Sequence, residues 1–109
     1  MTLNEYQALA QRTSNRALEA KGHLLNGVLG LSGEAGECAD LVKKHYFQDR
    51  RPFVDALEDE LGDVLWYVAE TAAALGVTLE EVAQRNVEKL KKRYPEGFEA
   101  EKSLHREAE

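Results

Sequence analysis

Apolar residues recur at steps of three and four along two long segments of the chain, and this period constrains the fold more than any other feature. In the first segment, from His23 to about Tyr46, the stripe comprises Leu24, Val28, Leu31, Ala35, Ala39 and Val42. In the second segment it comprises Val54, Leu57, Leu61, Val64, Leu65, Val68 and Leu75. Steps of three and four place side chains on one face of an α-helix, whereas a strand alternates in steps of two. The pattern therefore predicts two long amphipathic helices.

Polar and small residues indicate a further helix before these two and a loop between them. Thr2 and Glu5 have the spacing of a capping box, in which each side chain binds a free N–H of the first helical turn. They predict a helix over Leu3–Ala20, which Gly22 separates from the next one. The stretch Gln48–Pro52 is polar, charged and ends in proline, and it predicts the loop between the two long helices.

Similar signals predict a fourth helix after the second long one. Gly76 suits the left-handed position that ends a helix. Thr78 and Glu81 have the spacing of a second capping box, and the helix that follows should stop at Tyr94-Pro95. No strand-like alternation of useful length is present. The predicted fold class is therefore all-α, a domain resembling a four-helix bundle.

The size of the chain predicts that this bundle is completed by a second copy. With 109 residues the chain fits one domain, here predicted as residues 1–98 with a charged tail at 99–109. A domain this short buries only about two thirds of the surface that its unfolded chain exposes, so a single copy is marginal. A homodimer or homotetramer is the expected state.

Charge and cysteine content limit the classes of partner and compartment. The formal net charge of −6 argues against nucleic-acid binding, because a phosphate backbone is bound through Lys and Arg. There is one cysteine, Cys38, which predicts a reducing cytoplasm and a small core residue rather than a nucleophile. No apolar run approaches the roughly 20 residues that span a bilayer, and the first residues lack the apolar core of a signal peptide. We expect a soluble protein without a membrane partner.

Paired acids lie beside both apolar stripes. At about 100° per residue, Glu60 and Asp63 fall on one flank of the second stripe with Tyr67 between them, and Glu34 and Glu37 fall on one flank of the first. Like charges at this spacing destabilise a helix, so a compensating cation is expected. Four facing carboxylates would form an oxygen cage suited to Mg²⁺ or Mn²⁺ and unsuited to zinc. The alternative is that these are solvated surface acids.

Glycines recur every three residues beside the first acidic pair, at Gly27, Gly30, Gly33 and Gly36. Each costs about 1 kcal/mol relative to alanine inside a helix, so each needs a compensating reason. Close approach of another backbone or of a ligand is one reason, and tight helix packing without a ligand is the other.

The acids and a downstream segment stand in the order of a known family. The order is E-x-x-E at Glu34 and Glu37, E-x-x-D at Glu60 and Asp63 within ELGDVLWY, and N-x-x-K-L-x-x-R-Y-P-x-G-F from Asn86 to Phe98. Three motifs in this order resemble the MazG-like branch of the all-α nucleoside triphosphate pyrophosphatases, and the similarity extends from Tyr6-Gln7 to Phe98. That family usually carries E-E-x-x-E, and here Gly33 stands in place of the first acid, which leaves the number of metal ions open.

The resemblance implies hydrolysis of a nucleoside triphosphate, with Mg²⁺, to a nucleoside monophosphate and pyrophosphate. It implies Glu37 as a metal ligand and possible base, with Glu34 beside it as a second catalytic acid, and Glu60 and Asp63 completing the metal site. It also implies substrate-binding residues on the last helix, namely Asn86, Lys89 and Arg93.

Several alternatives remain open at this point. Lys89 and Arg93 lie in the run VEKLKKR, which also fits an ordinary solvated helix face. Trp66 and Tyr67 are candidates for stacking on a base, although aromatic residues on a helix often serve packing. The substrate could instead be dUTP, dCTP or phosphoribosyl-ATP. From another class, the chain could be a non-catalytic helical module whose acids bind a structural ion or a partner.

Overall fold

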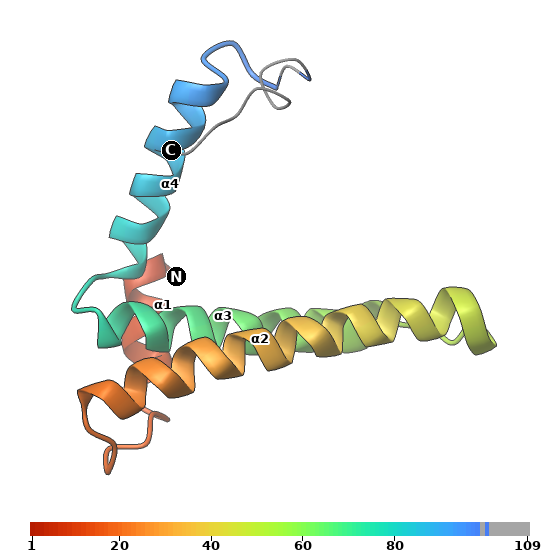
Figure 1. Ribbon diagram of the computed structural model, residues 1–109, viewed down its shortest axis with the longest axis horizontal. Helices are drawn as coiled ribbons and strands as arrows, with labels where there is room; N and C mark the ends of the chain where they lie inside the picture. Colours follow the sequence, from red (N-terminus) through yellow and green to blue (C-terminus); the bar gives the residue numbers. More distant parts are fainter. Residues whose placement is uncertain (99, 101–109) are drawn as a thin grey trace. The chain divides into compact units, whose positions relative to one another are not determined.

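The structure, a computed structural model, describes residues 1–98 and 100, and these residues are helical without any strand (Figure 1). The elements in chain order are α1 (Leu3–Gln11), α2 (Ala20–Lys44), the π-helical turn η1 (His45–Asp49), α3 (Val54–Ala74) and α4 (Leu79–Arg93). The predicted all-α class and the four predicted helices are confirmed. The chain divides into two compact units, Met1–Leu79 and the residues from Glu80 onward.

The first unit is built on α2 and α3, which run antiparallel beside one another (Figure 1). The core lies where α1 packs on α3, and its buried apolar residues are Ala10, Ala69, Ala72 and Leu79. Gln7 is buried there as well, and its amide donates to the carbonyls of Ala69 and Val77 and accepts from the N–H of Leu79. One amide side chain thus ties α1 to the turn after α3.

The helix α1 begins at Leu3 with the predicted capping box, because Thr2 and Glu5 exchange both side-chain hydrogen bonds. Its predicted end near Ala20 is wrong, since the helix stops at Gln11. Tertiary contacts cause the early end, because Thr13 and Ser14 leave the helical path and bind side chains of α3. Local helical periodicity is a weaker influence than these contacts.

The other boundaries follow the prediction more closely. Gly22 does not separate two helices, since α2 starts at Ala20 and includes it. The loop predicted over Gln48–Pro52 starts with the last residues of η1 and then turns at Arg50, whose φ is 55°. Gly76 adopts a φ of 76°, which confirms its predicted left-handed role after α3.

Large apolar side chains remain exposed along α2 and α3, namely Leu25, Val28, Leu29, Leu61 and Leu65. Exposed apolar surface of this extent is typical of proteins that associate. Completion by a second copy stays a prediction. No helix of the described chain is long and apolar enough to cross a membrane.

The second unit carries α4 and the turn that follows it. The helix ends at Arg93, immediately before the predicted stop at Tyr94-Pro95. The rings of Tyr94 and Phe98 then pack together with centroids 5.5 Å apart, across a turn in which Gly97 has a φ of 94°. The predicted tail at 99–109 lies outside the described residues except for residue 100, and its boundary stays a prediction.

Candidate metal and nucleotide site

Two glycines of α2 bring the long helices into close contact. A side chain at Gly27 would collide with Thr71, and one at Gly30 would collide with the ring of Tyr67. Thr71 follows Tyr67 by one helical turn, and its hydroxyl donates to the Tyr67 carbonyl at 2.7 Å. Tight packing of α2 against α3 therefore accounts for these two glycines, which is the second of the two reasons considered from the sequence. Gly33, in contrast, faces open space.

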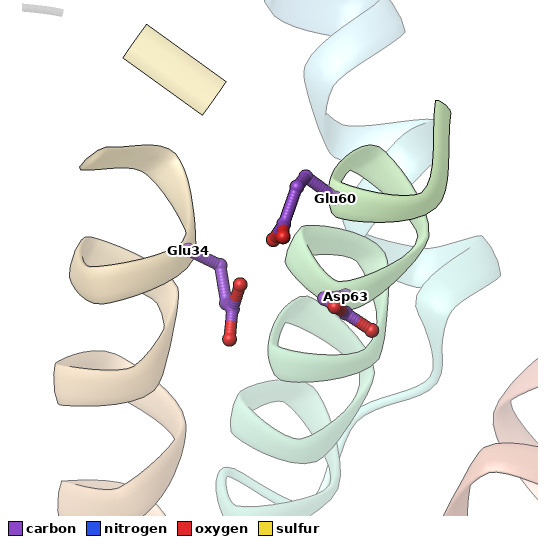
Figure 2. A group of neighbouring side chains, drawn as sticks. All are labelled: Glu34, Glu60 and Asp63. Carbon is purple, nitrogen blue, oxygen red and sulfur yellow. The ribbon is translucent and has the colours of Figure 1, made fainter. Parts of the chain in front are cut away.

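One turn beyond this contact the two helices present three acids to one another. Glu34 on α2 and Glu60 and Asp63 on α3 each offer one carboxylate oxygen, and these oxygens all lie within 4.8 Å of one another. Figure 2 shows Glu34 and Glu60 pointing toward each other from the two helices. Glu34 and Glu60 are half-buried and Asp63 is exposed. Three of the four predicted metal ligands thus meet.

The electrostatics of this cluster centre on Glu60. Its Oε2 is buried and has no hydrogen-bond donor. The pKa of Glu60 is raised, first by a proton shared in a hydrogen bond with Glu34, then by burial and by the negative charges of Glu34, Asp63 and Asp59. Only a shared proton or a cation removes the repulsion among these carboxylates. The donor set is oxygen alone, and it fits a hard divalent cation.

A pocket of about 320 Å³ opens directly beside the acids, lined by Glu34, Asp63, Trp66 and Tyr67. It combines two carboxylates with two aromatic rings, and the rings meet edge to face with centroids 5.0 Å apart. Both aromatic residues predicted to contact a base therefore border the same space as the acids.

Trp66 also has a packing role. Its indole N–H donates to the Ala10 carbonyl at 3.1 Å and to the Thr13 hydroxyl at 2.8 Å. The ring is therefore held by the last turn of α1 and the segment that follows it. The packing interpretation of Trp66 is therefore confirmed, and its stacking on a base stays a prediction, for a residue that also lines the pocket.

Glu37, the remaining predicted ligand, is exposed on α2 and lies outside the group of three. The antiparallel register nevertheless continues past the contacts at Gly27 and Gly30, so the turn that carries Glu37 runs beside the turn that carries Glu60. Its ligand and base roles stay predictions.

The three substrate-binding candidates on the last helix all belong to the second unit. Asn86, Lys89 and Arg93 follow one another at steps of three and four along α4, which places them on one face. Lys89 lines a hollow of about 560 Å³ together with Arg85, Glu88 and Lys92, so three cations surround one acid there. The role of this face toward the substrate stays a prediction.

Sequence reasoning missed Glu70, which is 1% exposed and lies ten residues after Glu60 on the same helix. Its carboxylate accepts hydrogen bonds from Gln11 at 3.0 Å, from Ser14 at 2.8 and 3.0 Å and from Asn26 at 3.5 Å, and His23 lies 3.3 Å away. Burial raises the pKa of Glu70, but these partners together lower it below its ordinary value. The donors come from distant parts of the chain, and no local motif announces them.

The comparisons with known proteins give a family match over most of the chain. Residues 24–98 match the family model of the MazG nucleotide pyrophosphohydrolase domain. A curated relative, the gene 37 protein of Mycobacterium phage L5, is 47% identical over 74 residues, which make up 63% of this chain and 64% of that protein. The chain thus spans less than two thirds of the relative's length. No solved structure shows a significant match.

Proposed function

Since the chain belongs to the MazG nucleotide pyrophosphohydrolase family, we propose that it hydrolyses a nucleoside triphosphate, with Mg²⁺, to a nucleoside monophosphate and pyrophosphate. One observation carries this proposal. Glu34, Glu60 and Asp63 converge beside an aromatic-walled pocket within the matched region, so a place for a cation and a place for a base adjoin.

The three converging acids are the proposed metal ligands, and the unpartnered Oε2 of Glu60 is the strongest sign that they bind a cation. When bound, Mg²⁺ offsets charge on the triphosphate and lowers the pKa of coordinated water, with Mn²⁺ as a possible substitute. The acids hold that charge between α2 and α3, next to the pocket.

Glu37 is proposed as the fourth ligand and as the base that accepts a proton from the attacking water. Glu34 is proposed as the neighbouring catalytic carboxylate. Glu37 stands three residues after Glu34, so both occupy one side of α2. A change of its side-chain rotamer directs it toward the turn of Glu60. An exposed carboxylate next to the metal ligands is within reach of a water molecule and can accept its proton.

The substrate is proposed to lie with its base against Trp66 and Tyr67, because these rings form the apolar part of the pocket beside the acids. Stacking on an aromatic ring is tolerant of base identity and is worth about 1–3 kcal/mol per base. Lys89 and Arg93 are proposed to bind phosphate oxygens and Asn86 to hydrogen-bond the substrate, because Mg²⁺ alone leaves part of the triphosphate charge uncompensated.

The active form is proposed to be a homodimer or homotetramer. The exposed apolar residues of α2 and α3, such as Leu29 and Leu61, support this proposal. The cytoplasm remains the proposed compartment, from the single cysteine.

The experiment is a product-release assay on the purified protein. Canonical and modified NTPs and dNTPs, including dUTP, dCTP and phosphoribosyl-ATP, are incubated with Mg²⁺ or with EDTA. We expect monophosphate and pyrophosphate only with Mg²⁺, and the panel names the preferred base. No turnover of any nucleotide would overturn the proposal in favour of a non-catalytic module that binds an ion or a partner.

Two variants sharpen this assay. Glu37→Gln and Asp63→Asn keep the shape of each side chain but remove its charge, and each should abolish turnover while the helical fold remains. Glu58→Gln is the matched control, because Glu58 is exposed on α3 outside the acidic group. Wild-type turnover by Glu37→Gln would overturn the role proposed for Glu37. It would leave the assignment of the other three acids intact.

A further inference from the structure

The aromatic wall of the pocket lies where it does because residue 30 has no side chain. A Cβ atom built on Gly30 would overlap three ring atoms of Tyr67, namely Cε1, Cδ1 and Cζ. Real Cβ atoms do not approach other atoms so closely, so with any residue but glycine the ring, or the helix that carries it, must shift away from α2. A Cβ atom on Gly33, three residues along the same helix, would meet nothing within 4 Å.

Tyr67 both rests against this glycine and borders the pocket. Its ring lines the pocket together with Glu34 and Asp63. Glu34 follows Gly30 by four residues and Asp63 precedes Tyr67 by four, so both acids are one helical turn from the contact. The contact and the two acids therefore occupy successive turns of the helices.

Neighbouring groups limit where a displaced ring can go. Trp66 packs edge to face against Tyr67 at an interplanar angle of 81°, and its own N–H is bound to Ala10 and Thr13. The backbone of α2 is the surface against which the ring now rests, and a methyl group there blocks a return to that position. The ring must then leave α2 and change the shape of the pocket.

We propose that Gly30 is a positioning residue that sets which bases the site accepts, by letting the Tyr67 ring rest against α2. This inference rests on the proposed function of the pocket. Purine bases have two rings and need more of the pocket than pyrimidine bases, which have one. A displaced Tyr67 side chain should therefore weaken the binding of purine nucleotides more than that of pyrimidine nucleotides.

The test compares Gly30→Ala with Gly33→Ala, which adds the same methyl group to the same helix in open space. Binding is measured by isothermal titration with α,β-imido dATP and α,β-imido dCTP in the presence of Mg²⁺, because these analogues resist cleavage between the α- and β-phosphates. We expect Gly30→Ala to weaken dATP-analogue binding by about tenfold or more and dCTP-analogue binding by less, within the range by which one methyl group alters selectivity in a pocket. Gly33→Ala should match the wild type in its preference.

A second comparison separates positioning from general helix packing. If Gly30 acts through Tyr67, then Gly30→Ala should change the purine preference of the wild type but not that of a Tyr67→Ala protein. The double variant also removes the clash, so it remains informative if Gly30→Ala alone fails to fold. Near-ultraviolet circular dichroism should change in Gly30→Ala, because the Trp66–Tyr67 pair is disturbed, and not in Gly33→Ala.

The possible outcomes keep this inference distinct from the proposed function. An unchanged purine-to-pyrimidine preference in Gly30→Ala, or an equal change in the Tyr67→Ala background, would overturn the positioning role even if hydrolysis is found. Failure of the wild type to bind either analogue would overturn the proposal that this pocket binds a nucleotide base. Binding with the expected preference but without hydrolysis would support the role of Gly30 in base binding and would overturn only the proposed reaction.

Discussion

Two glutamates on α3, Glu60 and Glu70, stand in opposite environments although only ten residues separate them. Glu70 is buried among the donors Gln11, Ser14 and Asn26, with His23 close by, and its pKa is lowered. Glu60 faces other acids, has a buried oxygen without a donor, and its pKa is raised.

The difference teaches how to tell a structural carboxylate from a functional one. Burying a charge costs free energy unless hydrogen bonds or an opposite charge compensate it. For Glu70 the chain supplies all of that compensation, so the residue holds the fold together. Around Glu60 the described chain offers other carboxylates and no donor to Oε2, so the compensation must come from a ligand or from a proton held with Glu34. Neutralising each residue should therefore have opposite effects.

The largest expected effect is on catalysis by Glu60→Gln. Removing this charge should lower turnover at least about a hundredfold, since even indirect partners of a metal ligand are worth 10–100-fold. The metal-free protein should be as stable as the wild type or more stable, because repulsion from Glu34 and Asp63 is relieved. The release assay and a thermal melt in EDTA measure the two effects. Full activity, or a clear loss of metal-free stability, would contradict this reading of Glu60.

The next effect is on stability in Glu70→Gln. An amide in this place presents N–H groups to side chains that are themselves donors, and a buried unsatisfied group costs about 1–3 kcal/mol. We expect the free energy of unfolding in urea to fall by that amount, with the midpoint shifted and Mg²⁺ binding retained. Glu58→Gln is again the matched control. A stability equal to that of the control would show that the donors around Glu70 contribute nothing net.

The smallest effect is in the pH dependence of stability. The pKa of folded Glu70 lies below its ordinary value of 4.5, so the unfolded chain binds a proton more readily than the folded one. The stability that Glu70 contributes is present above that ordinary value and is lost as the pH falls through the lowered one. Urea titrations at about pH 6 and about pH 3.5 should show a larger loss for the wild type than for Glu70→Gln. Equal losses would mean that Glu70 is not charged in the fold.

Much of the architecture was predictable because it depends on local pattern. The periods in α2 and α3, the capping box at Thr2 and the left-handed Gly76 each involve residues close in sequence, and the structure has each of them. The end of α1 was not predictable in this way. It depends on Thr13 and Ser14 binding α3, more than fifty residues away.

The candidate site likewise has some features that local spacing predicts and others that depend on tertiary packing. Spacing alone placed Glu60 and Asp63 on one flank of a helix, and it placed Glu34 on the flank of another. Which of the acids meet depends on the crossing of α2 and α3, and the crossing brings in Glu34 and leaves Glu37 exposed. The pairing of Gly30 with Tyr67 likewise requires the register of the two helices.

By itself the sequence determined that this chain is all-helical, that it carries acids in a MazG-like order, and where its long helices run. These properties are set by the helical repeat and by neighbours within one or two turns. Only the tertiary structure decided that Glu70 is satisfied and Glu60 is not. The reason is that the environment of a buried carboxylate is made of donors and charges brought from distant segments, and their identity cannot be read from spacing along one helix.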